Sequence, residues 1–317
     1  MTYAQFGTVQ ASDFNTLVGG NPTTTANTLN ATWATGGGTA GYGQTAVANV
    51  TVGQSVAATS QWASLVTNTA NAATHQGSSI TSVTAPVAGG TITFLSAIPT
   101  NLQTIYTNRL NAATQGSTTA NSVTTATTWS DKATWTHTAT FANGDAARYF
   151  FNSGGQLKIT MSHPTGTGIN LLLNNLASNV GTVVMSAPSS GTISVAGTSY
   201  NGITRVGGGG NSPTTLPNSG YYAMTTANAN VYYQTASTGP SGYLSTNVNI
   251  FIKSNGTQGV NGDAGSVITI YTVWDEIPNG LVVSSGSVVT VTAQAPETTN
   301  LANTWGAITL SGSVAVV

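Results

Sequence analysis

Charged side chains are almost absent from this chain. Of its 317 residues only 13 are charged, six Lys or Arg and seven Asp or Glu, and none lies between residues 14 and 108. An ordinary soluble domain has about a quarter of its residues charged. Such a chain cannot cover its surface with charge, so hydroxyl and amide side chains must meet the solvent. We therefore expect much of the surface to lie against other chains, as in a component of an assembly.

The composition predicts a β-rich fold with many loops. Threonine alone occurs 57 times, and 37 glycines and ten prolines supply turns. β-Branched threonine favours strands, and its hydroxyl group can replace a charge as the solvent contact. An aromatic content of 8% and a formal net charge of −1 argue against intrinsic disorder.

Several classes of protein are excluded or disfavoured by the same numbers. A near-neutral chain without a cluster of Lys and Arg lacks the electrostatic footprint of a nucleic-acid-binding protein. No run of 18 apolar residues is present, so we expect no membrane insertion. Zero cysteines exclude disulfides and thiolate chemistry. Residues 1–6 lack the pattern of a secretory signal, which predicts synthesis in a host cytoplasm.

Residues 1–120 are predicted to form a loop-rich, partly helical domain. Apolar residues recur at helical spacing in residues 56–70 and 97–110. Both segments run into similar endings, and we interpret Gly77 and Gly116 as helix stops. The match predicts two helices packed side by side, with coincidence in a chain rich in Ala, Asn and Thr as the alternative. Residues 111–128 are small and polar and are the predicted linker.

Residues 121–317 are predicted to form an antiparallel β-sandwich, jelly-roll-like, of seven to nine strands. Segments 243–253 and 266–274 are expected to form one long hairpin, and residues 169–177 a short helix. The other expected strands are residues 135–141, 156–161, 181–185, 192–198, 231–235, 286–295 and 307–316.

The sequence contains no specific catalytic or metal-binding pattern. The three histidines, His75, His137 and His163, are far apart in the sequence and have no second ligand nearby. Asp275 and Glu276 are the only adjacent carboxylates, and neighbours in a strand point to opposite faces. We therefore predict a protein that is not an enzyme, with no cofactor and no metal site.

Tyrosines crowd one stretch of the predicted sandwich, and they allow two interpretations. Tyr221, Tyr222, Tyr232 and Tyr233 could form an aromatic rim that stacks sugar rings, which makes them candidate glycan contacts. Alternatively, strand alternation places one tyrosine of each pair inside and its neighbour outside. The pattern favours alternation, since it explains the pairs without a ligand.

The most specific segment is residues 141–155, which combines two of the rare charges with three consecutive aromatics and two adjacent glycines. Asp145 is expected to cap a short helical turn and to pair with Arg148 three residues later. The aromatic residues are expected to anchor that turn in the core, and the end of the segment to reverse the chain. The motif residues are Phe141, Asp145, Arg148, Tyr149, Phe150, Phe151, Asn152, Gly154 and Gly155.

This segment, with its Arg-Tyr-Phe-Phe-Asn-Ser-Gly-Gly core, resembles one found in virion structural proteins of tailed bacteriophages, especially contractile-tailed cyanophages. The amino-terminal third is similar to such proteins at short motifs that follow the same order. Together the matching stretches cover about a fifth of the chain, and residues 207–220 have no counterpart. The short motifs are residues 13–15, 41–44, 61–65 and 75–77.

The resemblance implies a structural virion protein without enzymatic activity, tail-associated, with copies of itself and other virion proteins as partners. The amino-terminal third would attach, and the sandwich would be exposed or form lateral contacts. One alternative is a receptor-binding module of a tail fibre that recognises a host surface glycan. Another is a bacterial surface-layer protein or adhesin.

Overall fold

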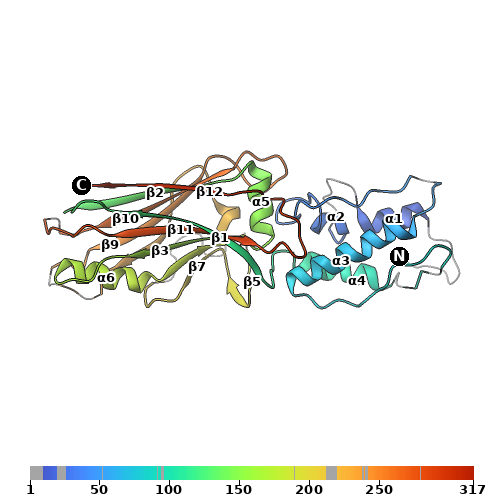
Figure 1. Ribbon diagram of the computed structural model, residues 1–317, viewed down its shortest axis with the longest axis horizontal. Helices are drawn as coiled ribbons and strands as arrows, with labels where there is room; N and C mark the ends of the chain where they lie inside the picture. The colour runs from blue at the N-terminus through green and yellow to red at the C-terminus, as the bar shows by residue number, and fades with distance from the viewer. Residues whose placement is uncertain are drawn as a thin grey trace.

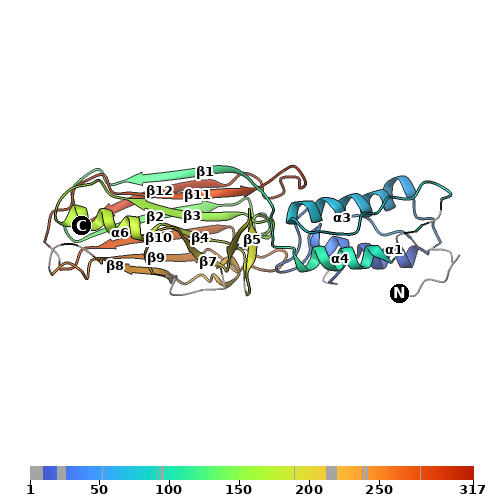
Figure 2. The ribbon, with the colours of Figure 1, turned by 90° about the horizontal axis from the view of Figure 1, so that it is seen from below.

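The structure is a computed structural model that describes residues 10–19, 26–51, 53–90, 92–93, 96–188, 190–211, 220–237, 239, 242–278 and 280–317. The molecule is elongated, with a helical part at one end and a β-sandwich at the other (Figure 1). The strands run along the long axis, and the carboxyl terminus lies at the end of the sandwich far from the helical part (Figures 1 and 2).

The helical part contains four α-helices among the described residues. The predicted pair is confirmed, since the two longest helices lie side by side (Figure 2). Gly77 ends the first of them in the left-handed conformation, with a φ of 67°, as a helix stop should. The helices are α1 (Ala11–Val18), α2 (Leu29–Thr32), α3 (Ala63–Gln76), which follows a π-helical turn at Ala58–Trp62, and α4 (Ala97–Thr107).

Two antiparallel sheets of five strands form the sandwich, so the predicted mainly β fold with an antiparallel sandwich is confirmed, whereas the predicted number of seven to nine strands is too low. The first sheet has the order β1 (Gln115–Thr124), β11 (Val288–Pro296), β3 (Gln156–Ser162), β4 (Thr182–Met185), β7 (Ile203–Val206). The second has the order β12 (Thr309–Val316), β2 (Lys132–Thr140), β10 (Val267–Asp275), β9 (Asn247–Ser254), β8 (Ala229–Thr235).

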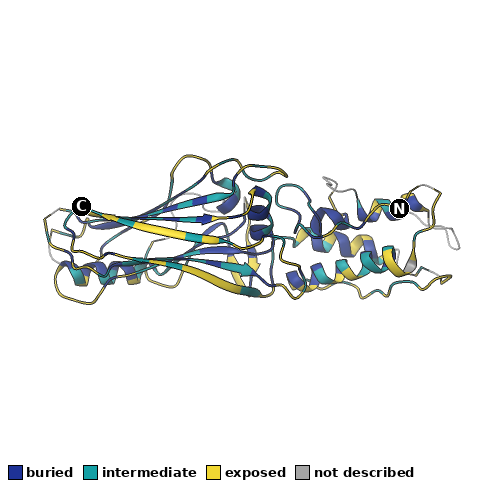
Figure 3. Ribbon diagram, turned by 45° about the horizontal axis from the view of Figure 1, so that its top comes forward, coloured by how far each residue is buried: buried dark blue, intermediate teal, exposed yellow. Residues whose placement is uncertain are grey.

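Alternation along the strands builds the core between the sheets (Figure 3). In β10, Ile268, Ile270, Thr272 and Trp274 are buried, whereas the residues that alternate with them are half-buried on the outer face. The predicted hairpin is confirmed, and its register places Ile270 opposite Ile252. Trp274 packs on Trp135 of β2, with ring centroids 5.4 Å apart. Burial of these large side chains is the main force that holds the two sheets together.

Smaller elements close the sandwich. The predicted short helix is confirmed as α6 (Ile169–Val180), which contacts β3 and β8 of opposite sheets. A hairpin of β5 (Ile193–Val195) and β6 (Thr198–Tyr200) replaces the single strand expected at residues 192–198 and buries Val184 of β4. A helix, α5 (Gly144–Asn152), lies at the end of the sandwich next to the helical part (Figure 1). A 3-10 turn covers Gly220–Ala223.

The linker predicted at residues 111–128 is wrong. Most of it is β1, a full edge strand that pairs with β11 along its length, so the predicted domain boundary at residues 120 and 121 falls inside a strand. Gly116 is therefore a strand residue and not a helix stop. The error has a physical cause, because β1 has hardly any apolar side chains and its exposed residues are mainly Ser and Thr. Of the run at residues 207–220, residues 212–219 lie outside the described residues.

Candidate functional site at the junction of the two parts

The motif at residues 141–155 forms α5 and places it where the sandwich meets the helical part. Its N-cap is Asn143, whose Oδ1 accepts a hydrogen bond from the Ala146 amide at 2.8 Å, so the cap predicted at Asp145 is wrong. Asp145 lies in the first turn, where the helix dipole favours a carboxylate. The predicted pair with Arg148 is confirmed at 3.1 Å.

One face of α5 anchors it in the sandwich through stacked aromatic rings. Phe150 and Phe151 are fully buried and lie 5.3 and 6.1 Å from the Phe141 ring. Phe151 stacks on Tyr221 with 4.3 Å between ring centroids. Gly155 lies so close to Phe150 that a Cβ atom there would be 2.7 Å from the ring. Phe150 and Phe151 therefore anchor α5 in the core, as predicted. Tyr149 does not, since it is half-buried and lies against the loop at Gly43.

The opposite face of α5 holds the helical part. Arg148 is 1% exposed and donates hydrogen bonds to the carbonyl oxygens of Ala40 and Thr35, each at 2.8 Å. Asn152 is fully buried and donates to the Gly41 carbonyl at 3.1 Å. A buried guanidinium needs such partners, because an unpaired charge in the interior is strongly destabilising.

The partner of α5 is the loop at residues 34–44, which contains one of the short motifs. Gly41 and Gly43 have positive φ angles of 98° and 71°. A Cβ atom at Gly41 would lie 2.1 Å from the Thr35 carbonyl oxygen, and one at Gly43 would lie 2.4 Å from the Tyr149 ring. Only glycine allows this backbone path and this close approach to α5. Gly154, just after α5, must also be glycine, because a Cβ atom there would clash with Ala112.

Tyr42, between these glycines, ties the loop to both long helices. Its hydroxyl group donates to the Arg109 carbonyl at 2.8 Å and accepts from Gln76 Nε2 at 2.7 Å. Burial raises the pKa of Tyr42 far above its ordinary value, so the phenol stays neutral. Gln76 and the neighbouring His75 belong to another of the short motifs, residues 75–77, at the end of α3.

A second set of bonds joins the helical part to the loop after β11. His75 Nδ1 lies 3.0 Å from Glu297 Oε1, and both side chains are buried. The bond to His75, with further bonds from Asn300 and Thr299, lowers the pKa of Glu297 to about 2. Gln44 donates to the Ala302 carbonyl at 2.8 Å and accepts from its amide at 2.9 Å. Glu297 was not among the predicted site residues. It is one of only seven carboxylates in the chain, and this rarity could have pointed to it.

These contacts define the junction, a buried polar interface between α5 with its flanking loops and the helical part. Four of the 13 charged residues stabilise it or border it. They are Arg109, Asp145, Arg148 and Glu297. Directional bonds between buried groups fix one geometry, so the junction couples the two parts rigidly.

Several of the histidine and carboxylate side chains that were considered for catalysis or metal binding form hydrogen bonds inside the fold. His163 is buried, with its ring nitrogens 2.8 Å from Ser287 Oγ and 2.9 Å from Asn170 Oδ1, and burial lowers its pKa. Glu276 is fully buried and accepts hydrogen bonds from the amides of Gly280 and Leu281. Across the part of the chain that the structure describes, no group of three or more His, Asp or Glu side chains could hold a metal ion.

The four tyrosines proposed as glycan contacts do not share an exposed surface. Tyr221 and Tyr232 are fully buried. Tyr222 is half-buried, and its hydroxyl group donates to the Gly38 carbonyl at 2.8 Å, so it belongs to the junction. Tyr233 is 37% exposed and points outward from β8. Strand alternation is confirmed for Tyr232 and Tyr233 of β8. It is wrong for Tyr221 and Tyr222, which lie in a 3-10 turn and not in a strand.

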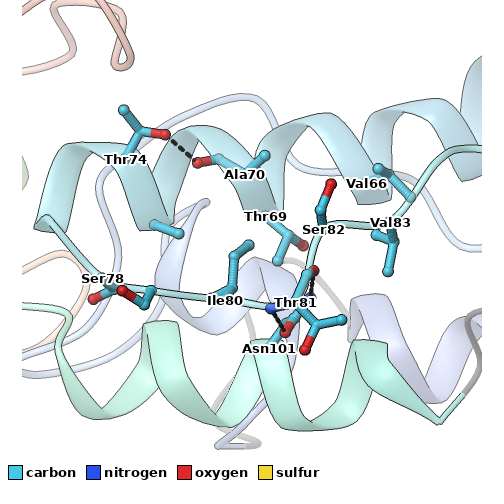
Figure 4. A pocket seen from close by; sticks show the side chains of 12 residues that line it. Val66, Thr69, Ala70, Thr74, Ser78, Ile80, Thr81, Ser82, Val83 and Asn101 are labelled. Carbon is cyan, nitrogen blue, oxygen red and sulfur yellow. Dashed lines mark hydrogen bonds between the residues drawn. The ribbon is translucent and has the colours of Figure 1, made fainter.

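The helical part has a groove of about 380 Å³ between α3 and the extended residues 78–83 (Figure 4). Asn101 of α4 holds this segment, since its Oδ1 accepts from the Thr81 amide and its Nδ2 donates to the Thr81 carbonyl. All the lining residues have alkyl, hydroxyl or amide side chains. Such a lining offers no acid or base for catalysis.

The comparisons with known proteins add no relative. No family model, no curated protein and no solved structure matches this chain. Among the described residues, no helix is both long enough and apolar enough to cross a membrane.

Proposed function

We propose that this protein is a structural component of a tailed-phage virion, tail-associated, that assembles with copies of itself and with other virion proteins. The resemblance of its short motifs to such proteins supports this role. Three of the five matching stretches contribute to the junction, namely residues 41–44, residues 75–77 and the α5 segment. A rigid, elongated body of two coupled parts suits a building unit, with the helical part as the attaching end.

The observation that carries the proposal is the uncharged, open edge of the sandwich. β12 is the outermost strand of its sheet, and the adjacent β1 is the outermost strand of the other. Neither strand contains a charged residue or a proline. Natural proteins usually protect such edges with lysine, proline or a covering loop, because an open edge pairs with other chains.

The edge strands β1 and β12 differ in the hydrogen-bond partners of their backbone groups. In β1 the Val123 carbonyl accepts a hydrogen bond from the Trp135 indole at 2.9 Å, so the strand is tied to the second sheet. For β12, pairing with β2 is the sole strand pairing among the described residues. Exposed side chains such as Ser311, Ser313 and Ala315 leave room for a second chain. We therefore assign the self-association surface to β12, with β1 beside it.

Light scattering over a concentration series tests this assignment. We expect the purified chain to form a discrete oligomer or a filament, and Ser311→Lys/Ser313→Lys to raise the concentration needed for assembly about tenfold or more, because like charges meet at the edge. Ser194→Lys/Ser199→Lys on the β5–β6 hairpin is the matched control, since both serines are exposed cross-strand partners. A 31.9 kDa monomer at every concentration would contradict self-assembly.

A further inference from the structure

The outer face of the second sheet carries a partly exposed aromatic surface, which the tyrosine pairs do not form. Tyr271 of β10 and Phe251 of β9 are direct cross-strand partners, and both are half-buried on this outer face. Asn230 of β8 lies opposite Phe251 and extends the row to the next strand. In the neighbouring row, Asn249 lies opposite Tyr233, which is 37% exposed.

Amide groups between these rings are held in fixed positions. Asn230 Nδ2 donates to Asn249 Oδ1 at 2.7 Å, and Asn249 Nδ2 donates to Asn247 Oδ1 at 2.6 Å. The chain of bonds orients the amides across β8 and β9 before any ligand arrives. We call Phe251, Tyr271, Tyr233, Asn230 and Asn249 the aromatic–amide platform.

The charged residues near the platform indicate which charge its ligand could carry. One cation contacts the platform, since Lys253 Nζ lies over the Tyr271 ring, 5.5 Å from its centre. Asp275 lies opposite Lys132, at the far end of the same strands. On the outer face, the rows between these positions contain only hydroxyl, amide, alkyl and aromatic side chains. An anionic ligand would therefore find no cluster of cations, and a cationic ligand would find no cluster of carboxylates.

We infer that the aromatic–amide platform binds a neutral carbohydrate. A sugar ring has an apolar face of C–H groups that stacks on Tyr or Phe, and a rim of hydroxyl groups that pairs with amides. Fixed rings and pre-oriented amides on one flat sheet match both features, and they lose little freedom on binding. The inference does not depend on assembly through β12, because the platform lies on β8, β9 and β10.

An array of immobilised oligosaccharides tests the inference with the full-length chain. We expect binding to neutral glycans built from hexose, deoxyhexose and N-acetylhexosamine, and Tyr271→Ala or Phe251→Ala to weaken binding about tenfold or more. Tyr271→Phe retains the ring and should retain most of the affinity. Tyr106→Ala, which removes a half-buried ring from α4, should leave binding unchanged.

Three results would overturn the inference. They are an array without any bound neutral glycan, binding that persists in both alanine variants, and binding restricted to sialylated or sulfated glycans. Circular dichroism of each variant checks that the fold is retained, which we expect because the platform side chains point outward. Light scattering of the same variants separates the two proposals, since a loss of glycan binding should leave assembly intact.

Discussion

Arg148→Ala should lower the free energy of unfolding by about 3–5 kcal/mol, because it removes the buried cation of the junction. The substitution leaves the carbonyl oxygens of Ala40 and Thr35 without their donor and opens a cavity beside α5. It also leaves Asp145 without its ion-pair partner. Chemical denaturation of the purified variant at neutral pH measures the loss.

Two variants sharpen this test. Arg148→Lys keeps the charge but lacks the planar fork that reaches two carbonyls, so it should recover only part of the stability. Arg205→Ala removes an arginine whose partners, Asn211 and Gly207, lie within the same surface loop, and it should cost about 1 kcal/mol or less. If Arg148→Ala cost no more than Arg205→Ala, the junction would not depend on the buried guanidinium.

Gly41→Ala should destabilise the protein by about 3 kcal/mol or more, through strain and a clash together. The backbone of Gly41 has a φ of 98°, and the new Cβ atom would lie 2.1 Å from the Thr35 carbonyl oxygen. That oxygen is also an acceptor for Arg148, so a shift of the loop breaks a second contact. Thermal unfolding followed by circular dichroism measures the effect.

Gly242→Ala separates the two contributions. Gly242 has a similar φ of 94°, but no atom of the residues that the structure describes lies within 4 Å of a Cβ atom built there. Its substitution should therefore cost only the backbone strain, about 1–2 kcal/mol. Equal losses in the two variants would show that the close approach of Gly41 to Thr35 is unimportant.

The sequence predicted most of the sandwich because its inner strands alternate strongly. The hairpin of β9 and β10 follows directly from that pattern, since Ile250, Ile252, Ile268 and Ile270 all point inward. β1 was missed because a strand that buries few side chains gives almost no periodic signal. α2 was missed because a helix of four residues is too short to show one.

The junction was only partly predictable. The pairing of Arg148 with Asp145 follows from helical spacing and was predicted. Contacts of Arg148 with Ala40 and Thr35 could not be predicted, because acceptors that are backbone carbonyls leave no mark on the sequence. His75 and Glu297 lie 222 residues apart, and nothing local in either segment points to the other.

The structure shows where several of the few charged side chains lie. Of the few ionisable groups, Arg148, Glu276 and Glu297 are buried, and they satisfy backbone or side-chain partners inside the molecule. The outer surface of the sandwich is therefore even less charged than the composition suggests. Surfaces of this kind suit contact with other subunits, whose interface centres are depleted in charge.

The most direct measurement is to image purified virions of the tailed phage that, on our proposal, encodes this chain, at a resolution that traces side chains. Our account predicts density for the protein in a tail-associated position, with β12 against a neighbouring subunit and the helical part toward the particle. Mass spectrometry of the same particles should detect the chain in multiple copies. Particles that lack the protein, or that contain it with the β12 edge facing solvent in every copy, would contradict the account.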